Sequence, residues 1–386
     1  MQTSGSMLNS STPRLNSQAH RVELGRGEFL ICGIDAQSLF LPQGDTASVD
    51  QLLDNLWRRR QRVLLALEMQ VQTRLAALAG ETGFAMALDC FKRLPEHCRR
   101  AVMEDPPIRV WLQHLPKGLL LDGGNLDSGD KLFSEQLREY CRVQGQVLQT
   151  LAEPQDGSFC RIQRYDVDPL ISQVAPPSFV FDDLDEKRRL DDCSPYTTRF
   201  FSEVLRAVMT RIEHVWPEMA IMMPRFIKTI VHLPDLESRS CSAQRFAGTV
   251  MLSSSDDTLL MVEESLVHEC GHQILYCVME LDPLVRPGTD VSFVLPWSGV
   301  ERDAYGYFHA TYIYLILAFL MEREIARGPD REQARKRLGE IVRGLKLALA
   351  DFREANFFTP IGEQFLQRML VVGTEVINRN SSHFLN

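Results

Sequence analysis

The amino-acid sequence predicts an α+β fold that is predominantly α-helical, with a small β-sheet next to one long helix. Apolar residues recur three and four positions apart over long stretches, as they do in amphipathic helices. Only two short runs, 226–233 and 246–252, combine β-branched and aromatic residues in the manner of strands. The second run leads through a Ser- and Asp-rich turn, where Asp256 or a preceding serine can cap the next helix, so we expect that helix to lie beside the sheet.

Composition and charge limit the classes of partner. The chain has 386 residues, of which 45% are hydrophobic and 24% charged, which suits one large domain or two moderate ones. Its net charge of −9 opposes a general affinity for nucleic acid or for an anionic membrane surface. We therefore expect neither nucleic acid nor membrane as a partner.

The N-terminus and the cysteines bear on location. Residues 1–22 are polar and lack the charged-then-apolar pattern of a secretory signal, so we expect a disordered tail there. The nine cysteines form no CxxC pair and have no disulfide-framework density. This usage favours reduced thiols and a cytoplasmic protein.

The helical pattern divides the chain into two regions. We expect a helical N-terminal region over 23–175 and a metal-binding catalytic region over 176–386, with an irregular, proline-containing connector across 153–195. In the first predicted helix, Arg58, Arg59 and Arg60 are expected on a solvated face. The predicted helices of both regions are 49–78, 83–91, 96–103, 131–149 and 197–215.

One stretch, 304–321, is apolar enough to raise the question of a membrane span. It carries no Lys, Arg, Asp or Glu and approaches the ~20 residues that cross a bilayer. It also contains a histidine, a threonine and several tyrosines, which are costly in hydrocarbon. We interpret it as a buried core helix.

The segment His268-Glu269-Cys270-Gly271-His272 has the HExxH pattern of metalloenzymes. In a helix, residues four apart share a face, so His268 and His272 can offer two imidazoles to one cation. The surrounding 23 residues, LLMVEESLVHECGHQILYCVMEL, have helical periodicity and no proline. The alternative is that both histidines are hydrogen-bonded core residues.

A third ligand must come from further along the chain, because the glycine and histidine of the extended metzincin motif are replaced by Leu275 and Val278. The apolar helix expected over 300–324 offers His309, Glu301, Glu322 and Glu324. Only His309 lies in its uncharged part, and we choose it as the third ligand.

The metal decides the reaction. Zinc would activate water, with Glu269 as general base, and would give a peptidase or an amidase. Iron(II), Fe(II), would instead bind a keto acid and dioxygen, and a nearby cation would hold the distal carboxylate of the co-substrate. Arg302 is a candidate for that cation, because on one continuous helix it would project from the same face as His309, about 10 Å along the axis. A helix-start salt bridge would explain Arg302 equally well.

The sequence resembles the HExxH-motif family of peptide-modification proteins, whose characterised members are similar to iron(II)- and 2-oxoglutarate-dependent peptide β-hydroxylases. The resemblance covers roughly the last 170 residues. Besides HECGH, the matching features are Leu266-Val267, Pro296-Trp297, Arg302, His309-Ala310, the approach from Ser238-Arg239-Ser240 to Gly248 and Leu252, and the ending from Leu349 to Leu366 with Phe358-Thr359-Pro360 and Gly362.

The resemblance implies His268, His272 and His309 as metal ligands, Arg302 as a 2-oxoglutarate contact, and a ribosomally made peptide as substrate. Two positions depart from the family pattern: Ser298 stands where an arginine tends to follow Pro-Trp, and Ala310 where a glycine tends to follow the third histidine. If the absent arginine held the co-substrate, Arg302 must replace it or the activity differs.

Three functions from different classes follow. The first is an Fe(II)- and 2-oxoglutarate-dependent peptide hydroxylase. The second is a zinc-dependent peptidase or amidase, and the third is a metal-free binding or scaffold protein in a peptide-modification pathway.

Overall fold

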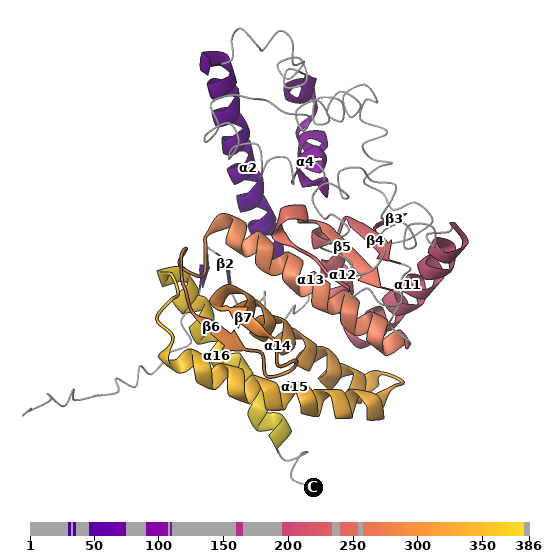
Figure 1. The fold of residues 1–386 in the computed structure, drawn as a ribbon. Helices are drawn as coiled ribbons and strands as arrows, with labels where there is room; N and C mark the ends of the chain where they lie inside the picture. The colour runs from indigo at the N-terminus through magenta and orange to yellow at the C-terminus, as the bar shows by residue number, and fades with distance from the viewer. Residues whose placement is uncertain are drawn as a thin grey trace, which may run out of the picture.

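The computed structural model confirms an α+β fold that is mainly helical with a small sheet. Helices form the greater part of the fold, and α13, α14, α15 and α16 lie against one another in sequence order (Figure 1). The structure describes residues 30–31, 34–35, 46–74, 90–106, 109, 160–164, 195–233, 240–253 and 258–381. The predicted tail 1–22, the predicted helix 131–149 and nearly all of 83–91 lie outside these ranges.

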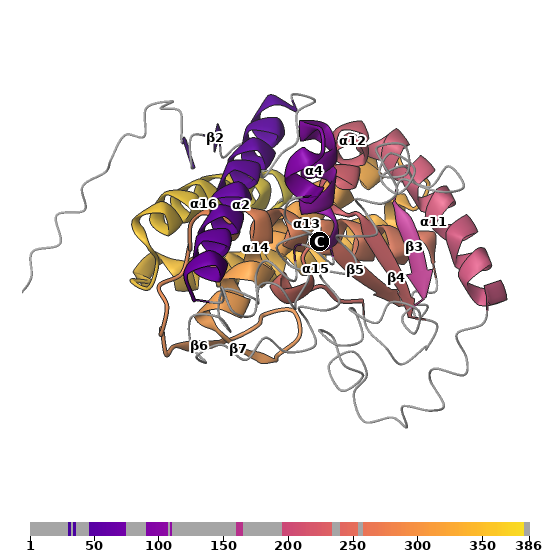
Figure 2. The same cartoon turned by 90° about the horizontal axis from the view of Figure 1, so that it is seen from above.

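The sheet beside the motif helix is parallel. Its order is β3 (Arg161–Arg164), β4 (Thr229–Leu233) and β5 (Thr249–Ser253), which lie side by side in Figure 2. All five residues of β4 and all five of β5 are buried, as is usual for parallel strands covered on both faces. Two further strand pairs are short: β1 (Leu30–Ile31) with β2 (Ile34–Asp35), and β6 (Ser292–Val294) with β7 (Glu301–Asp303).

The predicted strands were found, with shifted ends. Phe226 is the last residue of a helix that the sequence analysis missed, α12 (Pro217–Phe226), which starts directly after α11 (Pro195–Val215). Proline is favoured at the first helical position, so Trp216-Pro217 ends one helix and begins another. β3 was also missed, and it lies within the predicted connector.

Elements from before the predicted boundary at residue 176 join the later region. β3 pairs with β4, and α2 (Ala47–Arg74) packs against α13 (Leu259–Leu281). α4 (Glu96–Glu104) packs against α2 in turn. Elements on either side of residue 176 therefore pack against one another. The organisation into two regions stays a prediction.

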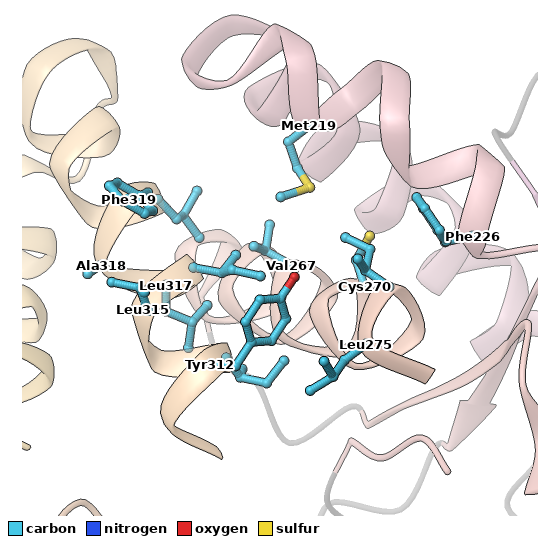
Figure 3. Close-up of a cluster of buried hydrophobic side chains, with 14 of the residues drawn as sticks. Met219, Phe226, Val267, Cys270, Leu275, Tyr312, Leu315, Leu317, Ala318 and Phe319 are labelled. Carbon is cyan, nitrogen blue, oxygen red and sulfur yellow. The ribbon is translucent and has the colours of Figure 1, made fainter. Parts of the chain in front are cut away.

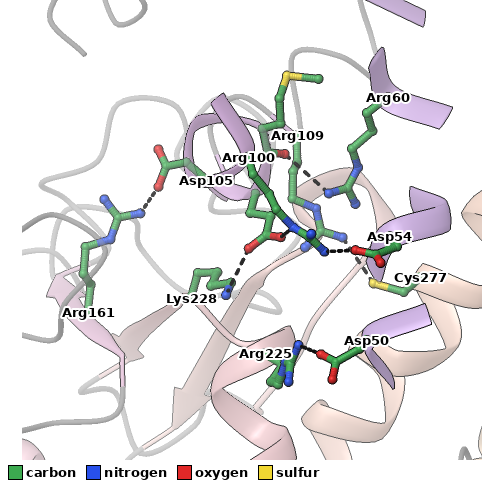
Figure 4. Close-up of polar contacts among 12 residues, drawn as sticks. Asp50, Asp54, Arg60, Arg100, Asp105, Arg109, Arg161, Arg225, Lys228 and Cys277 are labelled. Atoms are coloured by element: carbon green, nitrogen blue, oxygen red, sulfur yellow. Dashed lines mark hydrogen bonds and ion pairs between the residues drawn. The ribbon is translucent and has the colours of Figure 1, made fainter. Parts of the chain in front are cut away.

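One arginine of the predicted solvated face is buried. Arg58 and Arg59 are exposed, but the Arg60 guanidinium donates to both carboxylate oxygens of Glu280 at 2.8 Å and ties α2 to the end of α13. Figure 4 shows Arg60 beside the equally buried Arg109, whose Nη2 lies 3.5 Å from the Cys277 sulfur. The expectation for Arg60 was wrong because its partner, Glu280, is 220 residues away in the chain. A helical pattern predicts only which residues share a face of one helix.

The core is built around α13 and α14 (Ala304–Arg327). Val267, Cys270 and Leu275 of α13 face Tyr312 and Leu315 of α14, with Met219 and Phe226 of α12 on the other side (Figure 3). The most apolar 18-residue window of α14 is 78% buried, which agrees with the prediction of a core helix. The outer layer consists of α15 (Arg331–Asp351) and α16 (Pro360–Asn380).

Both central helices begin at side-chain caps. The Thr258 hydroxyl accepts from the Met261 N–H, so Thr258 caps α13 rather than Asp256 or one of the serines before it. The Asp303 carboxylate accepts from the Gly306 N–H at 2.7 Å and starts α14. The predicted helix over 300–324 was therefore wrong at its beginning, because residues 301–303 form β7.

A buried acidic cluster joins four elements. Glu263 of α13 and Glu324 of α14 are both fully buried, and both accept from Arg211 of α11, at 2.9 and 3.1 Å. Asp330, just before α15, accepts from the same guanidinium at 2.7 Å. Burial, together with the neighbouring Glu324 carboxylate, raises the pKa of Glu263 to about 8.

This raised pKa predicts a loss of stability with rising pH. The folded protein holds the Glu263 proton more tightly than the unfolded chain, in which the pKa takes its ordinary value of 4.5. The stabilisation is complete below about pH 4.5 and is lost as the pH rises through about 8. We expect the free energy of unfolding, from urea titrations, to fall over that range.

The variant Glu263→Gln stays neutral at every pH and should flatten this dependence. Glu332→Gln, at an exposed position on α15, is the matched control and should keep the wild-type profile. An unchanged pH profile in Glu263→Gln would contradict the assignment.

Candidate metal centre

The two motif histidines lie on α13 and the third comes from α14. The His268 and His272 rings have centroids 5.0 Å apart, and those of His272 and His309 are 5.6 Å apart. The Nδ1 atoms of His272 and His309 are separated by 3.4 Å. Two nitrogens at zinc-ligand distances around a tetrahedral centre lie about 3.3 Å apart, so this pair has a spacing that ligands use.

The other third-ligand candidates lie elsewhere. Glu324 binds Arg211, and Glu322 accepts from Arg379 and Asn380 of α16. Glu301 is exposed on β7 and accepts from Ser292. Of the four candidates on this segment, His309 alone contacts a motif histidine.

Within the described ranges, no group of three or more His, Cys, Asp or Glu side chains already has the arrangement of a metal shell. His309 is 3% exposed, and its Nε2, the ring nitrogen other than the one near His272, has no hydrogen-bond partner among the described residues, which is unusual for a buried polar atom. The His268 side chain is 31% exposed, so its ring has room to turn. Imidazole is a donor that transition metals prefer, but holding one ion between all three rings would require His268 to turn from its present position.

Burial keeps the three imidazoles neutral. It lowers the pKa of His309 to about 3 and the pKa of His272 well below its ordinary value. The pKa of His268 is lowered by burial and by the Arg337 guanidinium. Metal ligation requires the deprotonated imidazole, so all three rings are in the ligating form at neutral pH.

Glu269 is a buried carboxyl that has no Lys or Arg partner among the described residues. Its side chain is 4% exposed, its Oε2 accepts from the Ser242 hydroxyl at 2.6 Å, and its Oε1 lies 3.9 Å from His268 Nε2. Burial raises its pKa to about 7, against the opposing effect of the Ser242 hydrogen bond. A carboxyl of this kind can take up or release a proton near neutral pH.

The loop that carries Ser242 is tied to the sheet. Cys241 and Met251 of β5 exchange two backbone hydrogen bonds of 2.9 Å, and the Tyr276 hydroxyl donates to the Ser242 carbonyl. α13 is fixed to the same strand, because Gln273 accepts from the Gly248 N–H and donates to the Thr249 carbonyl. Ser242 is a site residue that sequence reasoning missed, since only the fold brings it to Glu269.

Aromatic rings surround His309. The Tyr305 ring lies 4.2 Å from it and the Tyr276 ring 5.4 Å, between centroids. Tyr305 belongs to the stretch 304–321 that the sequence predicted as a buried core helix. Trp297, from the Pro-Trp pair, stacks on Tyr314 at 3.8 Å and donates to the Ile341 carbonyl, so it holds α15 against α14.

A cavity of about 460 Å³ opens beside the motif, between α13 and α15. His268 and Glu269 line its inner end, while Arg337 and Lys336 of α15 line one wall. Neither cation was singled out from the sequence, because α15 shows only an ordinary amphipathic charge pattern.

Arg302 is exposed on β7, pairs with Phe293 of β6, and is not among the residues that line this cavity. Its placement on the His309 helix was wrong, because α14 begins only at Ala304. Its stem packs near Gly306 instead. The role of Arg302 as a 2-oxoglutarate contact stays a prediction.

The spacing of α13 and α14 depends on Gly271, one residue before His272. A Cβ at this position would lie 2.7 Å from Ile313 Cδ1 and 3.2 Å from Ile316 Cδ1. We predict that Gly271→Ala and Ile313→Val, which lacks Cδ1, are coupled by about 0.5 kcal/mol or more in a double-mutant cycle of unfolding free energies. Additive effects would show that the two helices do not meet at this glycine.

The chain matches no family model and no curated protein sequence.

Proposed function

We propose that this protein is a metal-dependent enzyme whose metal ion is held by His268, His272 and His309. The observation that carries the proposal is the approach of two imidazoles from different helices, since the Nδ1 atoms of His272 and His309 lie 3.4 Å apart and the His268 ring lies 5.0 Å from that of His272. Three neutral nitrogen ligands leave coordination positions open for reactants, which distinguishes a catalytic site from a closed structural one.

The reaction that we propose is hydroxylation of a peptide, with 2-oxoglutarate and dioxygen as co-substrates. When bound, Fe(II) would supply the oxidation: one oxygen atom enters a C–H bond of the peptide, and the other enters succinate as carbon dioxide leaves. The motif resemblance supports this choice. A cavity of about 460 Å³ that reaches His268 also has the volume of an ordinary ligand site.

The chain's own residues would position reactants and control protons. His268 and His272 are both partly exposed, and of the trio His268 is the one that lines the cavity, so reactants approach from its side. Tyr276 and Tyr305 cover His309 and keep water from the inner side of the site. Glu269, held by Ser242, would carry a proton at Oε1 beside His268.

One observation favours a second candidate, a zinc-dependent peptidase or amidase. Glu269 lines the cavity, and its pKa of about 7 is suitable for a general base that takes a proton from water. In this reaction zinc would supply the activated water and Glu269 would accept its proton. The same residue would be a positioning group in the hydroxylase.

Elemental analysis of anaerobically purified protein tests the metal proposal. We expect close to one metal ion per chain in the wild type and a loss of most of it in His309→Ala, because two ligands hold a cation much more weakly than three. His214→Ala, at an exposed position on α11, is the control and should retain the metal. A wild-type protein without metal would instead support a binding or scaffold function.

The variant Glu269→Gln separates the two reactions. For the hydroxylase we expect succinate formation from 2-oxoglutarate and a +16 Da peptide product, with Glu269→Gln keeping measurable turnover. For the hydrolase we expect peptide cleavage that falls by at least about 100-fold in Glu269→Gln, since the base is removed. Cleavage without consumption of 2-oxoglutarate would reject the hydroxylase.

A further inference from the structure

The groove between α13 and α15 is lined by side chains of both helices. Along the α13 wall, Leu260 and His268 are eight residues apart, or about 12 Å along the helix axis. This length matches three to four residues of extended peptide, at about 3.3 Å each.

Most of the charges on the groove walls are already paired. Arg337 of α15 binds both carboxylate oxygens of Glu264 on α13, at 2.6 to 3.1 Å, and also Glu340 at 3.0 Å. These ion pairs link the two walls, and they occupy the hydrogen-bond donors of the Arg337 guanidinium. Arg337 is therefore a support of the groove rather than a free ligand-binding cation.

Three polar side chains on the walls have no hydrogen-bond or ion-pair partner among the described residues: Ser265, Gln333 and Lys336. Each can donate a hydrogen bond, and the single full charge among them is the positive charge of Lys336. Gln333 and Lys336 are three residues apart on α15, so they share one face of the helix. Donors with one positive charge match a carboxylate, which only accepts.

We propose that Lys336, assisted by Gln333, is a carboxylate-binding subsite in the groove that leads to His268. The carboxylate comes either from a dicarboxylate co-substrate or from an acidic side chain of the peptide substrate. This inference rests on the proposed function for its ligands, because it assumes that reactants reach the metal centre through this groove. The proposal assigns to Lys336 the carboxylate-binding role for which Arg302 was the candidate from the sequence.

Isothermal titration of the full-length protein measures the subsite without turnover. Glutarate, a dicarboxylate without the keto group, represents the co-substrate. The peptide Ac-Ala-Glu-Ala-Ala-NH2, compared with its Gln analogue, represents an acidic substrate. Lys336→Met removes the charge at an exposed position, and Lys346→Met, exposed on the same helix but outside the groove, is the matched control. Arg302→Met is measured beside them.

We expect glutarate or the Glu peptide to bind the wild type, and Lys336→Met to weaken that binding by about tenfold or more, as loss of a charge-assisted hydrogen bond does. Lys346→Met should change it by less than about twofold. The probe that responds identifies the source of the carboxylate. Equal affinities in wild type and Lys336→Met, an effect confined to Arg302→Met, or no binding of either probe to the wild type would overturn the proposal.

Metal content measured on the same preparations keeps the two proposals separate. Protein that holds its metal but shows no Lys336-dependent binding rejects the subsite and leaves the metal centre standing. Lys336-dependent binding by protein that holds no metal supports the subsite and rejects the metal centre.

Discussion

The close approach of α13 and α14 at Gly271 is the contact on which the candidate site depends. Without a Cβ at this position, Ile313 packs directly against the backbone of α13. His272 is the next residue along α13, and His309 lies one helical turn before Ile313 on α14. The packing that buries the two apolar helices therefore also sets the 3.4 Å separation of the two imidazoles. The core and the candidate site lie at the same interface between two helices. The close packing of the interior therefore also restrains the site residues.

Three glutamates of α13 with different partners show why Glu269 differs from an ordinary structural acid. Glu280, at the end of the helix, is paired with Arg60, and that guanidinium lowers its pKa. Glu263, near the beginning, binds Arg211 and shares it with two other carboxylates. Glu269, between them, accepts from the Ser242 hydroxyl and has no guanidinium partner within the part of the chain that the structure describes. Keeping a buried carboxyl charged costs free energy when so few partners stabilise the charge. Carboxyls of this kind are common among the groups that transfer protons in enzymes.

Local rules predicted the parts of the site that lie within one helix. The spacing of His268 and His272 sufficed to place both rings on one face, and the uncharged surroundings of His309 predicted that it would be buried. What sequence reasoning missed depends on contacts over long distances in the chain. Ser242 reaches Glu269 because a single bridge ties Cys241 to β5. Arg302 was misplaced for a local reason, namely the Asp303 cap, because α14 begins at Ala304, four residues later than the predicted helix over 300–324.

The two sides of the candidate site differ. The inner side bears on metal binding, and the outer side bears on the substrate. On the inner side, aromatic rings enclose His309. This side of the site therefore offers an imidazole as its ligand-binding group. On the outer side, His268 faces a groove whose walls come from α13 and α15. An HExxH pair alone is compatible with hydrolysis and with oxidation, because both need two imidazoles and open coordination positions. The choice between them must then come from the outer side. A groove that binds a second small carboxylate beside the peptide suits an oxidation with a co-substrate, whereas hydrolysis needs only the peptide and water.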